Sequence, residues 1–349
     1  MSFKTNDIMF LLGAGCSFDA KIPVANKMIE DIEKELLPKD TDWKKFKDLY
    51  NYVKSSIIYA EGIFGKFNNP FSIEKFVNVL TELEKKEANI VYPFIANWNN
   101  RLLDLAGGNF ENIKKLKSLI TRQLIEWIKL DNYKEASYYK AFYDFQRELQ
   151  LPLRIFSLNY DLCFEQIQPL DFDLEMGFDD DKIWNSVRFE ENDYVNVGIY
   201  LYKLHGSITW KRDIDKGNIL TLSEHPVKEP DLIFGTDAKL QSIDPYLFYV
   251  YEFRKYSLVS KLIIVIGYSF SDNYINNLLK QALEHEPDRK LIYVSPSEEE
   301  TPEVIKTKLN LNGCNQLIFK KKTAKEFLTQ ELKLDQISTY LSKSMDDVF

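Results

Sequence analysis

A run of five apolar residues, followed at once by two closely spaced glycines, is the sequence feature that most restricts how this chain can fold. The run covers residues 8–12, and Gly13, Gly15 and Ser17 follow it directly. This is the order of strand, phosphate loop and helix found in nucleotide-binding α/β folds. A tight turn from a strand into a helix also needs glycines for geometric reasons alone. The motif therefore predicts a buried first strand and leaves a nucleotide site as one of two explanations.

Strand signals, as short runs rich in apolar residues, recur in the second half of the chain, where helical patterns separate several of them. The runs cover residues 153–157, 199–204, 231–234, 262–266, 291–294 and 316–319. Apolar residues spaced three and four apart predict helices at 245–260, 272–285 and 301–309. Because strands joined by crossover helices pair in parallel, the fold class we expect is α/β, with a doubly wound, Rossmann-like parallel sheet. Residues 208–223 indicate instead a hairpin that turns at 216–218.

The long segment after the first strand has a helical pattern throughout. From residue 24 to residue 149 it is rich in Lys and Glu, and its breaks fall near Pro38, at 62–70 and at Gly107 and Gly108. We therefore expect a large all-helical insertion subdomain at 24–149. The Rossmann-like domain would be formed by residues 1–23 and 150–322, and a C-terminal helix would lie within 323–349.

Composition and charge argue against several classes of function. A chain of 349 residues with 45% apolar residues can fill a real core. Its net charge of −8 disfavours direct nucleic-acid binding, since phosphate-binding surfaces need an excess of Lys and Arg. The apolar runs are too short to span a bilayer, and Cys16, Cys163 and Cys314 lack metal-ligand spacing. We expect a cytoplasmic protein that binds neither a membrane nor a metal.

Polar side chains follow two of the predicted strands at the point where each strand ends. Asn159 and Asp161 come after the strand at 153–157, and His205 comes after the strand at 199–204. Ligands bind beyond the carboxyl ends of strands in doubly wound sheets, and a histidine there is a candidate acid or base. In the structural alternative, Asn159 and Asp161 cap the helix that follows, and His205 has no chemical role.

A second glycine turn follows the most hydrophobic strand of the chain, at 262–266. Gly267 and Ser269 would form a second cradle for a phosphate or a ribose at the same edge of the sheet. Ser271 or Asp272 is expected to cap the helix that follows.

Together these four elements resemble the sirtuin-like (silent information regulator) superfamily. The family pattern is a Gly-Ala-Gly-x-Ser loop, an Asn-x-Asp motif, a His-Gly pair and a late Gly-x-Ser turn, and this chain has all four in that order. Ile22 and Pro23 match the family's Gly-Ile-Pro step, although Lys21 replaces the glycine. The resemblance covers about residues 7–20 and 150–320, and it implies NAD as the bound nucleotide.

The resemblance also implies a role for each matching position. Asn159 would contact the nicotinamide-side ribose, and Asp161 would orient the carboxamide. His205 would act near the ribose hydroxyls, so Asn159 and His205 are the expected catalytic residues. The NAD pyrophosphate would be held by Gly13, Ala14, Gly15 and Ser17, and the adenosine side by Gly267 and Ser269.

Two departures from the deacetylase branch define the expected activity. The chain lacks a four-cysteine zinc module, and it carries the long helical insertion. It looks more like the bacterial sirtuin-like effectors of anti-phage defence, which hydrolyse NAD to nicotinamide and ADP-ribose. That likeness implies NAD as substrate, a homo-oligomer and a separately encoded HerA-type hexameric ATPase as partner. A non-catalytic sensor or scaffold that binds NAD or ADP-ribose, and an NAD-dependent protein deacylase, remain as alternatives.

Overall fold

The computed structural model describes residues 3–65, 71–85, 99–190, 197–234, 243–311 and 315–341. The chain forms two compact units. One unit combines Met1–Ile22 with Lys129–Phe349, and the other is Pro23–Ile128. Cys314, one of the three cysteines, lies outside the described residues.

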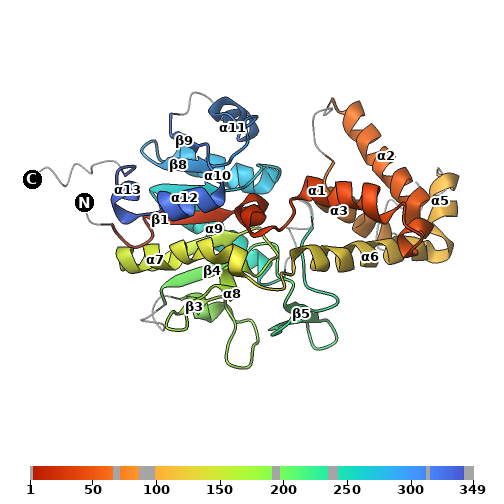
Figure 1. Ribbon diagram of the computed structural model, residues 1–349, viewed down its shortest axis with the longest axis horizontal. Helices are drawn as coiled ribbons and strands as arrows, with labels where there is room; N and C mark the ends of the chain where they lie inside the picture. Colours follow the sequence, from red (N-terminus) through yellow and green to blue (C-terminus); the bar gives the residue numbers. More distant parts are fainter. Residues whose placement is uncertain are drawn as a thin grey trace, which may run out of the picture. The chain divides into compact units, whose positions relative to one another are not determined.

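A seven-stranded parallel sheet forms the centre of the first unit (Figure 1). Its spatial order is β3-β4-β2-β1-β7-β8-β9, and every pairing is parallel. The predicted doubly wound α/β fold is therefore confirmed. The strands are β1 (Ile8–Leu12), β2 (Leu153–Ser157), β3 (Leu174–Glu175), β4 (Ile199–Lys203), β7 (Leu262–Ile266), β8 (Lys290–Val294) and β9 (Leu317–Lys320).

The order of the strands places a topological switch point beside β1. From β1 the chain passes to β2 on one side, whereas β7 lies on the other side and leads outward to β8. In register, Leu12 pairs with Ser157 of β2 and with Ile266 of β7. In doubly wound sheets, ligands bind outside the carboxyl ends of strands at such a point.

Aromatic side chains cover both faces of the sheet. On one face Phe10 packs edge-on against Phe142 of α7 (Lys140–Leu149), with ring centroids 5.3 Å apart. On the other face Phe156 packs against Phe253 of α9 (Tyr246–Val259), with centroids 5.1 Å apart. Burial of each such aromatic side chain stabilises the folded state by about 1.5–3 kcal/mol. Helix α10 (Asn273–His285) packs beside α9.

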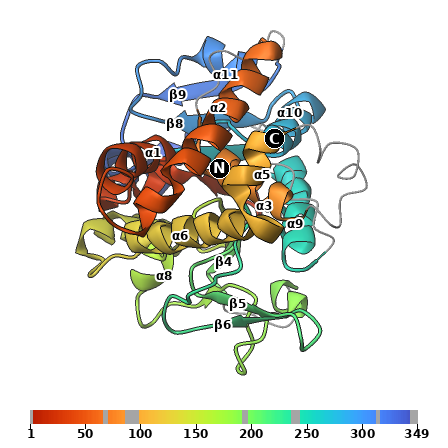
Figure 2. The same cartoon turned by 90° about the vertical axis from the view of Figure 1, so that its right-hand side faces the viewer.

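Shorter elements complete the first unit. The chain leaves β1 through a 3₁₀ helix, η1 (Ala14–Ala20), and the antiparallel hairpin of β5 and β6 is drawn in green at the bottom of Figure 2. The hairpin was predicted, and residues 216–218 do lie in its turn. The other elements are η6 (Lys134–Tyr139), α8 (Cys163–Gln166), η7 (Ser186–Phe189), β5 (Trp210–Asp213), β6 (Ile219–Leu222), α11 (Pro302–Lys308), α12 (Ala324–Gln330) and α13 (Leu334–Ser338).

Two predicted elements differ in the structure. Residues 231–234 form no strand, and only Leu232 makes an isolated bridge, to Gly206. The C-terminal helix expected within 323–349 is instead two short helices, α12 and α13, because α12 ends at Gln330 and the chain turns before Leu334.

The second unit is helical, as its sequence pattern predicts. Helix α3 packs on α1 and α6, with Leu80 of α3 and Leu116 and Ile120 of α6 buried. The elements are α1 (Ala25–Asp31), a π-helix η2 (Ile32–Leu36), η3 (Asp42–Phe46), α2 (Lys47–Ile63), α3 (Ile73–Glu84), α5 (Asn100–Ala106), η5 (Gly108–Phe110) and α6 (Glu111–Ile128).

The compact helical unit is shorter than the predicted insertion of residues 24–149. It ends at Ile128, and the segment that forms η6 and α7 belongs to the sheet unit. The physical reason is the aromatic packing of this segment on β1, where Phe142 and Phe145 both contact Phe10. No helix in the described part of the chain combines the length and the apolar character that crossing a membrane requires.

Candidate functional site

The two predicted glycine loops pack against each other at the switch point. Gly13 N–H donates to the Ile266 carbonyl at 2.9 Å, and Gly15 N–H donates to the Gly267 carbonyl at 2.8 Å. A Cβ atom on Gly13 would lie 2.6 Å from the Gly267 oxygen, and one on Gly267 would lie 2.3 Å from the Cys16 nitrogen. Gly267 also has a φ of +64°, which L side chains rarely adopt. Close contact between the backbones of the two loops thus requires glycine at these positions.

Part of this loop pair is open to solvent. Ala14 and Ser269 are exposed, Gly15 and Gly267 are partly exposed, and the ring of Phe18 is 54% exposed. These loops therefore present backbone, a hydroxyl and an aromatic ring at the sheet edge where ligands bind.

A cation lies beside the second loop. Lys308 at the end of α11 donates from Nζ to the Ser269 carbonyl at 3.0 Å and also pairs with Glu300 at 3.2 Å. The sequence analysis did not single out Lys308, because nothing near residue 308 marks it as a neighbour of Ser269.

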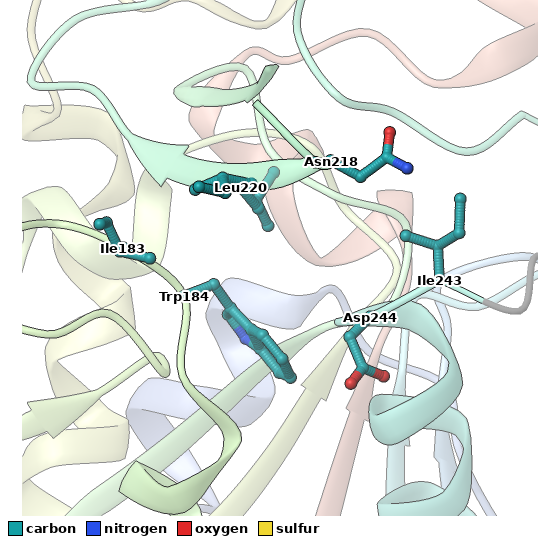
Figure 3. A pocket seen from close by; sticks show the side chains of 8 residues that line it. Ile183, Trp184, Asn218, Leu220, Ile243 and Asp244 are labelled. Atoms are coloured by element: carbon teal, nitrogen blue, oxygen red, sulfur yellow. The ribbon is translucent and has the colours of Figure 1, made fainter. Parts of the chain in front are cut away.

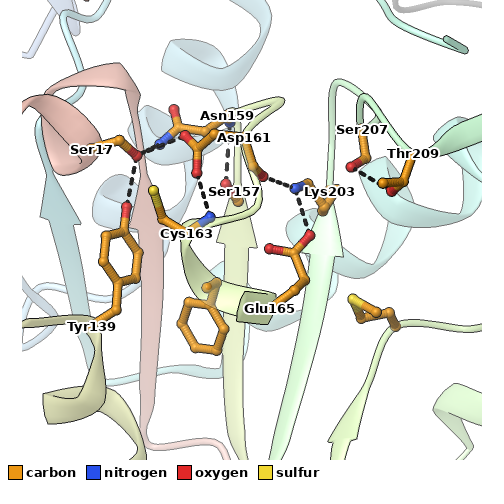
Figure 4. Close-up of polar contacts among 12 residues, drawn as sticks. Ser17, Tyr139, Ser157, Asn159, Asp161, Cys163, Glu165, Lys203, Ser207 and Thr209 are labelled. Carbon is orange, nitrogen blue, oxygen red and sulfur yellow. Dashed lines mark hydrogen bonds and ion pairs between the residues drawn. The ribbon is translucent and has the colours of Figure 1, made fainter. Parts of the chain in front are cut away.

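Ser17 lies at the centre of a buried hydrogen-bond network (Figure 4). Its hydroxyl donates to Asp161 Oδ2 at 2.7 Å and accepts from Asn159 Nδ2 at 3.2 Å. Because a hydroxyl has one proton, the third contact, 2.8 Å to the Tyr139 hydroxyl, has Tyr139 as donor. Asn159 Nδ2 also donates to the Gly13 carbonyl at 3.0 Å. The network joins the first glycine loop to the Asn159–Asp161 motif.

Both carboxylate oxygens of Asp161 accept hydrogen bonds from the protein. Oδ2 accepts from Ser17, and Oδ1 accepts from Cys163 N–H at 2.9 Å, at the start of α8. The N-cap of α8 is Leu162, so Asp161 is not the capping residue, although it does accept from the first N–H of that helix. The side chain of Asn159 reaches toward the glycine loop instead. Its amide donates to the Gly13 carbonyl in that loop, and its main-chain N–H donates to Ser157 Oγ at 3.2 Å.

A buried ion pair lies beneath the Asn159–Asp161 turn. Lys203, the last residue of β4, has a side chain that is 2% exposed, and its Nζ lies 2.7 Å from Glu165 Oε1. The same ammonium donates to the Asp161 carbonyl oxygen. Burial raises the pKa of Glu165 above its ordinary value, and Lys203 partly offsets this increase. Both charged residues were missed in the sequence analysis.

His205 lies two residues beyond the end of β4 and is buried. Its Nε2 lies 3.9 Å from Oδ2 of Asp272, which is beyond hydrogen-bonding distance and near the outer limit for an ion pair. The ring of Tyr160, next to Asn159, lies 6.2 Å from the His205 ring. Gly206 has a φ of +86°, and a Cβ atom there would lie 2.1 Å from the Asp231 carbonyl oxygen.

Asp272 is the residue that caps α10, as the sequence predicted for Ser271 or Asp272. Its Oδ1 accepts from Tyr274 N–H at 3.0 Å and from Ile275 N–H at 3.4 Å. Its other oxygen faces His205. One side chain from the loop after β7 therefore reaches a residue that follows β4, across the ends of β2 and β1.

Burial also sets the protonation of the nearby thiol and phenol groups. It raises the pKa of the fully buried Cys16 thiol to about 12, and it raises the pKa of Tyr139 well above its ordinary value. Cys16 is therefore a thiol at neutral pH and no nucleophile, and Tyr139 keeps the proton it donates to Ser17.

A separate cavity of about 400 Å³ lies beside the β5–β6 hairpin (Figure 3). The Trp184 indole forms one wall, with its Nε1 donating to the Tyr249 hydroxyl at 3.0 Å. Among the described residues that line this cavity, none was predicted as a site residue. The lining residues are Ile183, Trp184, Gly217, Asn218, Ile219, Leu220, Ile243 and Asp244.

The structure brings most of the predicted residues to one edge of the sheet. Ser17 links Asn159 to Asp161, Asn159 also donates to the Gly13 carbonyl, and Gly15 contacts Gly267. His205 follows the neighbouring strand. Four further residues contact members of this group or each other and were missed or given no chemical role: Tyr139, Glu165, Lys203 and Asp272.

Among the described residues, no group of three or more His, Cys, Asp or Glu side chains is arranged to hold a metal ion.

Comparison with known proteins identifies one matching family. The model of the family described as SIR2-like domain matches residues 153–314, which include Asn159, Asp161, His205, Gly267 and Ser269. No curated relative matches the chain. Two similar solved structures are a Sir2 homologue in complex with NAD (13% identity, 95% of this chain and 90% of that chain covered, TM-score 0.46) and a mutant Sir2 homologue in complex with ADP-ribose (13% identity, 97% and 94% covered, TM-score 0.48).

Proposed function

We propose that this protein is an NAD glycohydrolase, which cleaves NAD to nicotinamide and ADP-ribose. The observation that carries the proposal is the convergence of four strand ends. The loops after β1 and β7 meet through Gly15 and Gly267, Asn159 follows β2, and His205 follows β4 and reaches Asp272. The SIR2-like domain match over residues 153–314 supports NAD as the substrate.

In this proposal the two glycine loops bind the nucleotide through their backbone. Ala14 and Gly15 would hold the pyrophosphate together with Gly13, and Gly267 and Ser269 would hold the adenosine side. The exposure of Ala14 and Ser269 supports these roles. The N–H groups of Gly13, Gly15 and Gly267 donate to carbonyls of the protein, so in this proposal the glycines let the ligand come close to the main chain because no Cβ atom holds it away.

Ser17 and Asp161 take indirect roles. The Ser17 hydroxyl is fully buried and makes three hydrogen bonds within the protein, so we assign it to holding Asn159 and Asp161 and not to contacting phosphate. Asp161 uses both oxygens to accept protein hydrogen bonds, and it would orient the nicotinamide carboxamide only with a remaining lone pair.

The reaction needs little acid catalysis, because NAD supplies a cationic ring that leaves as neutral nicotinamide. Asn159 would fix the ribose and the attacking water, and His205 would take the proton of that water. The Asp272 carboxylate, 3.9 Å away, would stabilise the imidazolium formed by this transfer. A positioned base of this kind contributes about 10²–10⁴-fold in rate.

We further propose that NAD depletion by this enzyme serves anti-phage defence in the cytoplasm. The support is the resemblance of the whole motif set to the bacterial defence effectors. On the same ground we expect a homo-oligomer that works with a separately encoded HerA-type hexameric ATPase. A stable monomer that hydrolyses NAD at full rate without a partner would contradict this part of the proposal.

The test is to incubate the purified protein with NAD, with and without the ATPase, and to measure nicotinamide and ADP-ribose by chromatography. We expect equal amounts of both products from the wild type. Asn159→Ala and His205→Ala should each release nicotinamide at least about 100-fold more slowly, because each removes a group that acts on the reacting ribose or water. If the protein binds NAD but releases no nicotinamide, the alternative of a non-catalytic NAD sensor would hold.

A further inference from the structure

A fully buried ammonium group beside a turn is unusual enough to require an explanation. Lys203 ends β4 with a side chain that is 2% exposed, in a strand whose other residues are apolar or aromatic. Removing a charge from water is costly, and a buried ion pair is often no more stabilising than apolar side chains of the same size. Stability alone is therefore a weak reason for placing Lys203 here.

The contacts of Lys203 lead to the turn that carries Asn159. Its Nζ donates to the Asp161 carbonyl oxygen and pairs with Glu165 Oε1 at 2.7 Å. Figure 4 shows the ammonium between this carbonyl and the Glu165 carboxylate. Glu165 belongs to α8, the helix that directly follows the turn, so the two contacts of Lys203 lie on either side of the point where the turn enters α8.

The segment that begins at Lys203 also holds the turn through main-chain hydrogen bonds. Leu204 N–H donates to the Ser157 carbonyl at 2.9 Å, and Ile208 N–H donates to the Tyr160 carbonyl at 3.2 Å. The carbonyls of Tyr160 and Asp161 are thus both held from the segment that carries His205. A shift of the turn relative to this segment would move Asn159 relative to His205.

We propose that Lys203 and Glu165 are positioning residues for NAD cleavage, in which the Lys203 ammonium fixes the Asn159–Asp161 turn against the segment that carries His205. The inference rests on the proposed function. Lys203 acts through the Asp161 carbonyl, and Glu165 neutralises and orients the ammonium. Catalytic groups must be held to within a fraction of an ångström, and a misplacement of about 1 Å costs about 100-fold in rate.

The test compares two double variants that each remove an ion pair with one fully buried partner, without leaving a lone charge. K203M/E165Q removes the proposed pair. R188M/E175Q is the matched control, because Arg188 lies 2.8 Å from the buried Glu175 in β3, which pairs with the opposite end of β4. For each protein we would measure kcat and KM for nicotinamide release, and amide hydrogen exchange by mass spectrometry over residues 157–166.

We expect K203M/E165Q to lower kcat by about 10- to 100-fold with KM within about threefold, and to speed exchange at the turn. R188M/E175Q should leave both kcat and the rate of hydrogen exchange at the turn as they are in the wild type. Wild-type kcat in K203M/E165Q, or unchanged exchange there, would overturn the proposal. If K203M/E165Q does not fold, K203Q/E165Q carries the same test, because it also removes both charges while keeping polar side chains at both positions.

The two readouts separate this inference from the proposed function. If the wild type releases no nicotinamide, the glycohydrolase assignment fails, whereas hydrogen exchange still decides whether Lys203 orders the turn. If the wild type is active but hydrogen exchange at the turn is the same in K203M/E165Q as in the wild type, the positioning role fails and the enzyme assignment stands.

Discussion

Main chain forms one half of the sheet edge, and buried polar side chains form the other half. At the ends of β1 and β7, backbone meets backbone, and the close contact between Gly13, Gly15 and Gly267 leaves no room for side chains. At the ends of β2 and β4, buried polar side chains fill the space, with Asn159 and Lys203 as examples. A ligand that approaches this edge meets main chain on one half and a polar network on the other.

This difference indicates a division of labour. Backbone groups bind phosphate whatever the neighbouring side chains are, provided that glycine permits close approach. Chemical groups must instead be held in one orientation, and a fully hydrogen-bonded buried network supplies that rigidity. We therefore expect changes in the β1–β7 half to affect folding and nucleotide binding, and changes in the β2–β4 half to affect turnover.

The largest effect in the β1–β7 half is expected for Gly267→Ala. Its Cβ atom would lie 2.3 Å from the Cys16 nitrogen, at a φ of +64°. Backbone strain and the clash together should lower the free energy of unfolding by about 3 kcal/mol. Gly217→Ala is the matched control, since Gly217 also has a positive φ, +82°, but a Cβ there meets nothing within 4 Å. It should cost about 1 kcal/mol. Equal costs in urea unfolding would show that the loop contact is unimportant.

A smaller effect, on turnover, is expected for Asp272→Asn. Asparagine caps a helix about as well as aspartate, so α10 keeps its N-terminal hydrogen bonds while the charge facing His205 is lost. We expect kcat to fall about tenfold, with less than about 0.5 kcal/mol lost in stability. Steady-state kinetics and thermal unfolding of the same preparation measure both. An unchanged kcat would contradict the proposed stabilisation of the His205 imidazolium by Asp272.

Tyr139→Phe should have a modest effect on both stability and turnover. It removes the hydrogen bond donated to Ser17 and should lower the free energy of unfolding by about 1 kcal/mol. Tyr143→Phe is a suitable control, because Tyr143 donates to the Phe164 carbonyl at 2.8 Å, away from Ser17. We expect similar stability losses in the two variants and a several-fold lower kcat only in Tyr139→Phe. A lower kcat in both would contradict the role of the Ser17 network.

The smallest effect concerns the pH dependence of stability. Burial raises the pKa of Glu165, so the folded protein holds this proton more tightly than the unfolded chain. The resulting stabilisation is fully present below the ordinary pKa of glutamate and is lost as the pH rises through the raised value. Thermal unfolding between about pH 4 and about pH 8 should therefore show a flatter profile for Glu165→Gln than for the wild type. Parallel profiles would contradict a raised pKa of Glu165.

The sequence predicted the sheet and much of its edge. Strands buried on both faces appear as runs rich in apolar residues, and the runs at β1, β2 and β7 lead into polar or glycine residues that the structure brings together. The cap at Asp272 followed from local preferences of helix termini. These features depend on residues that are neighbours in the sequence.

The features that the sequence did not reveal depend on long-range contacts. Tyr139 lies 122 residues from Ser17, in a segment whose helical pattern resembles that of the helical unit before it. The packing of α7 on Phe10 likewise has no local signature, and the predicted insertion therefore ran to residue 149 whereas the compact helical unit ends at Ile128. Lys203 did carry a signal, since a lysine at the end of an apolar strand implies a buried partner.

One pair of measurements on His205→Ala tests the central claim, that the β1–β7 half binds and the β2–β4 half reacts. Calorimetry with ADP-ribose, which cannot be cleaved at the nicotinamide bond, gives affinity, and chromatography with NAD gives turnover. The account predicts a Kd for ADP-ribose within about threefold of wild type, and nicotinamide release at least about 100-fold slower. Loss of ADP-ribose binding, or release at the wild-type rate, would contradict it.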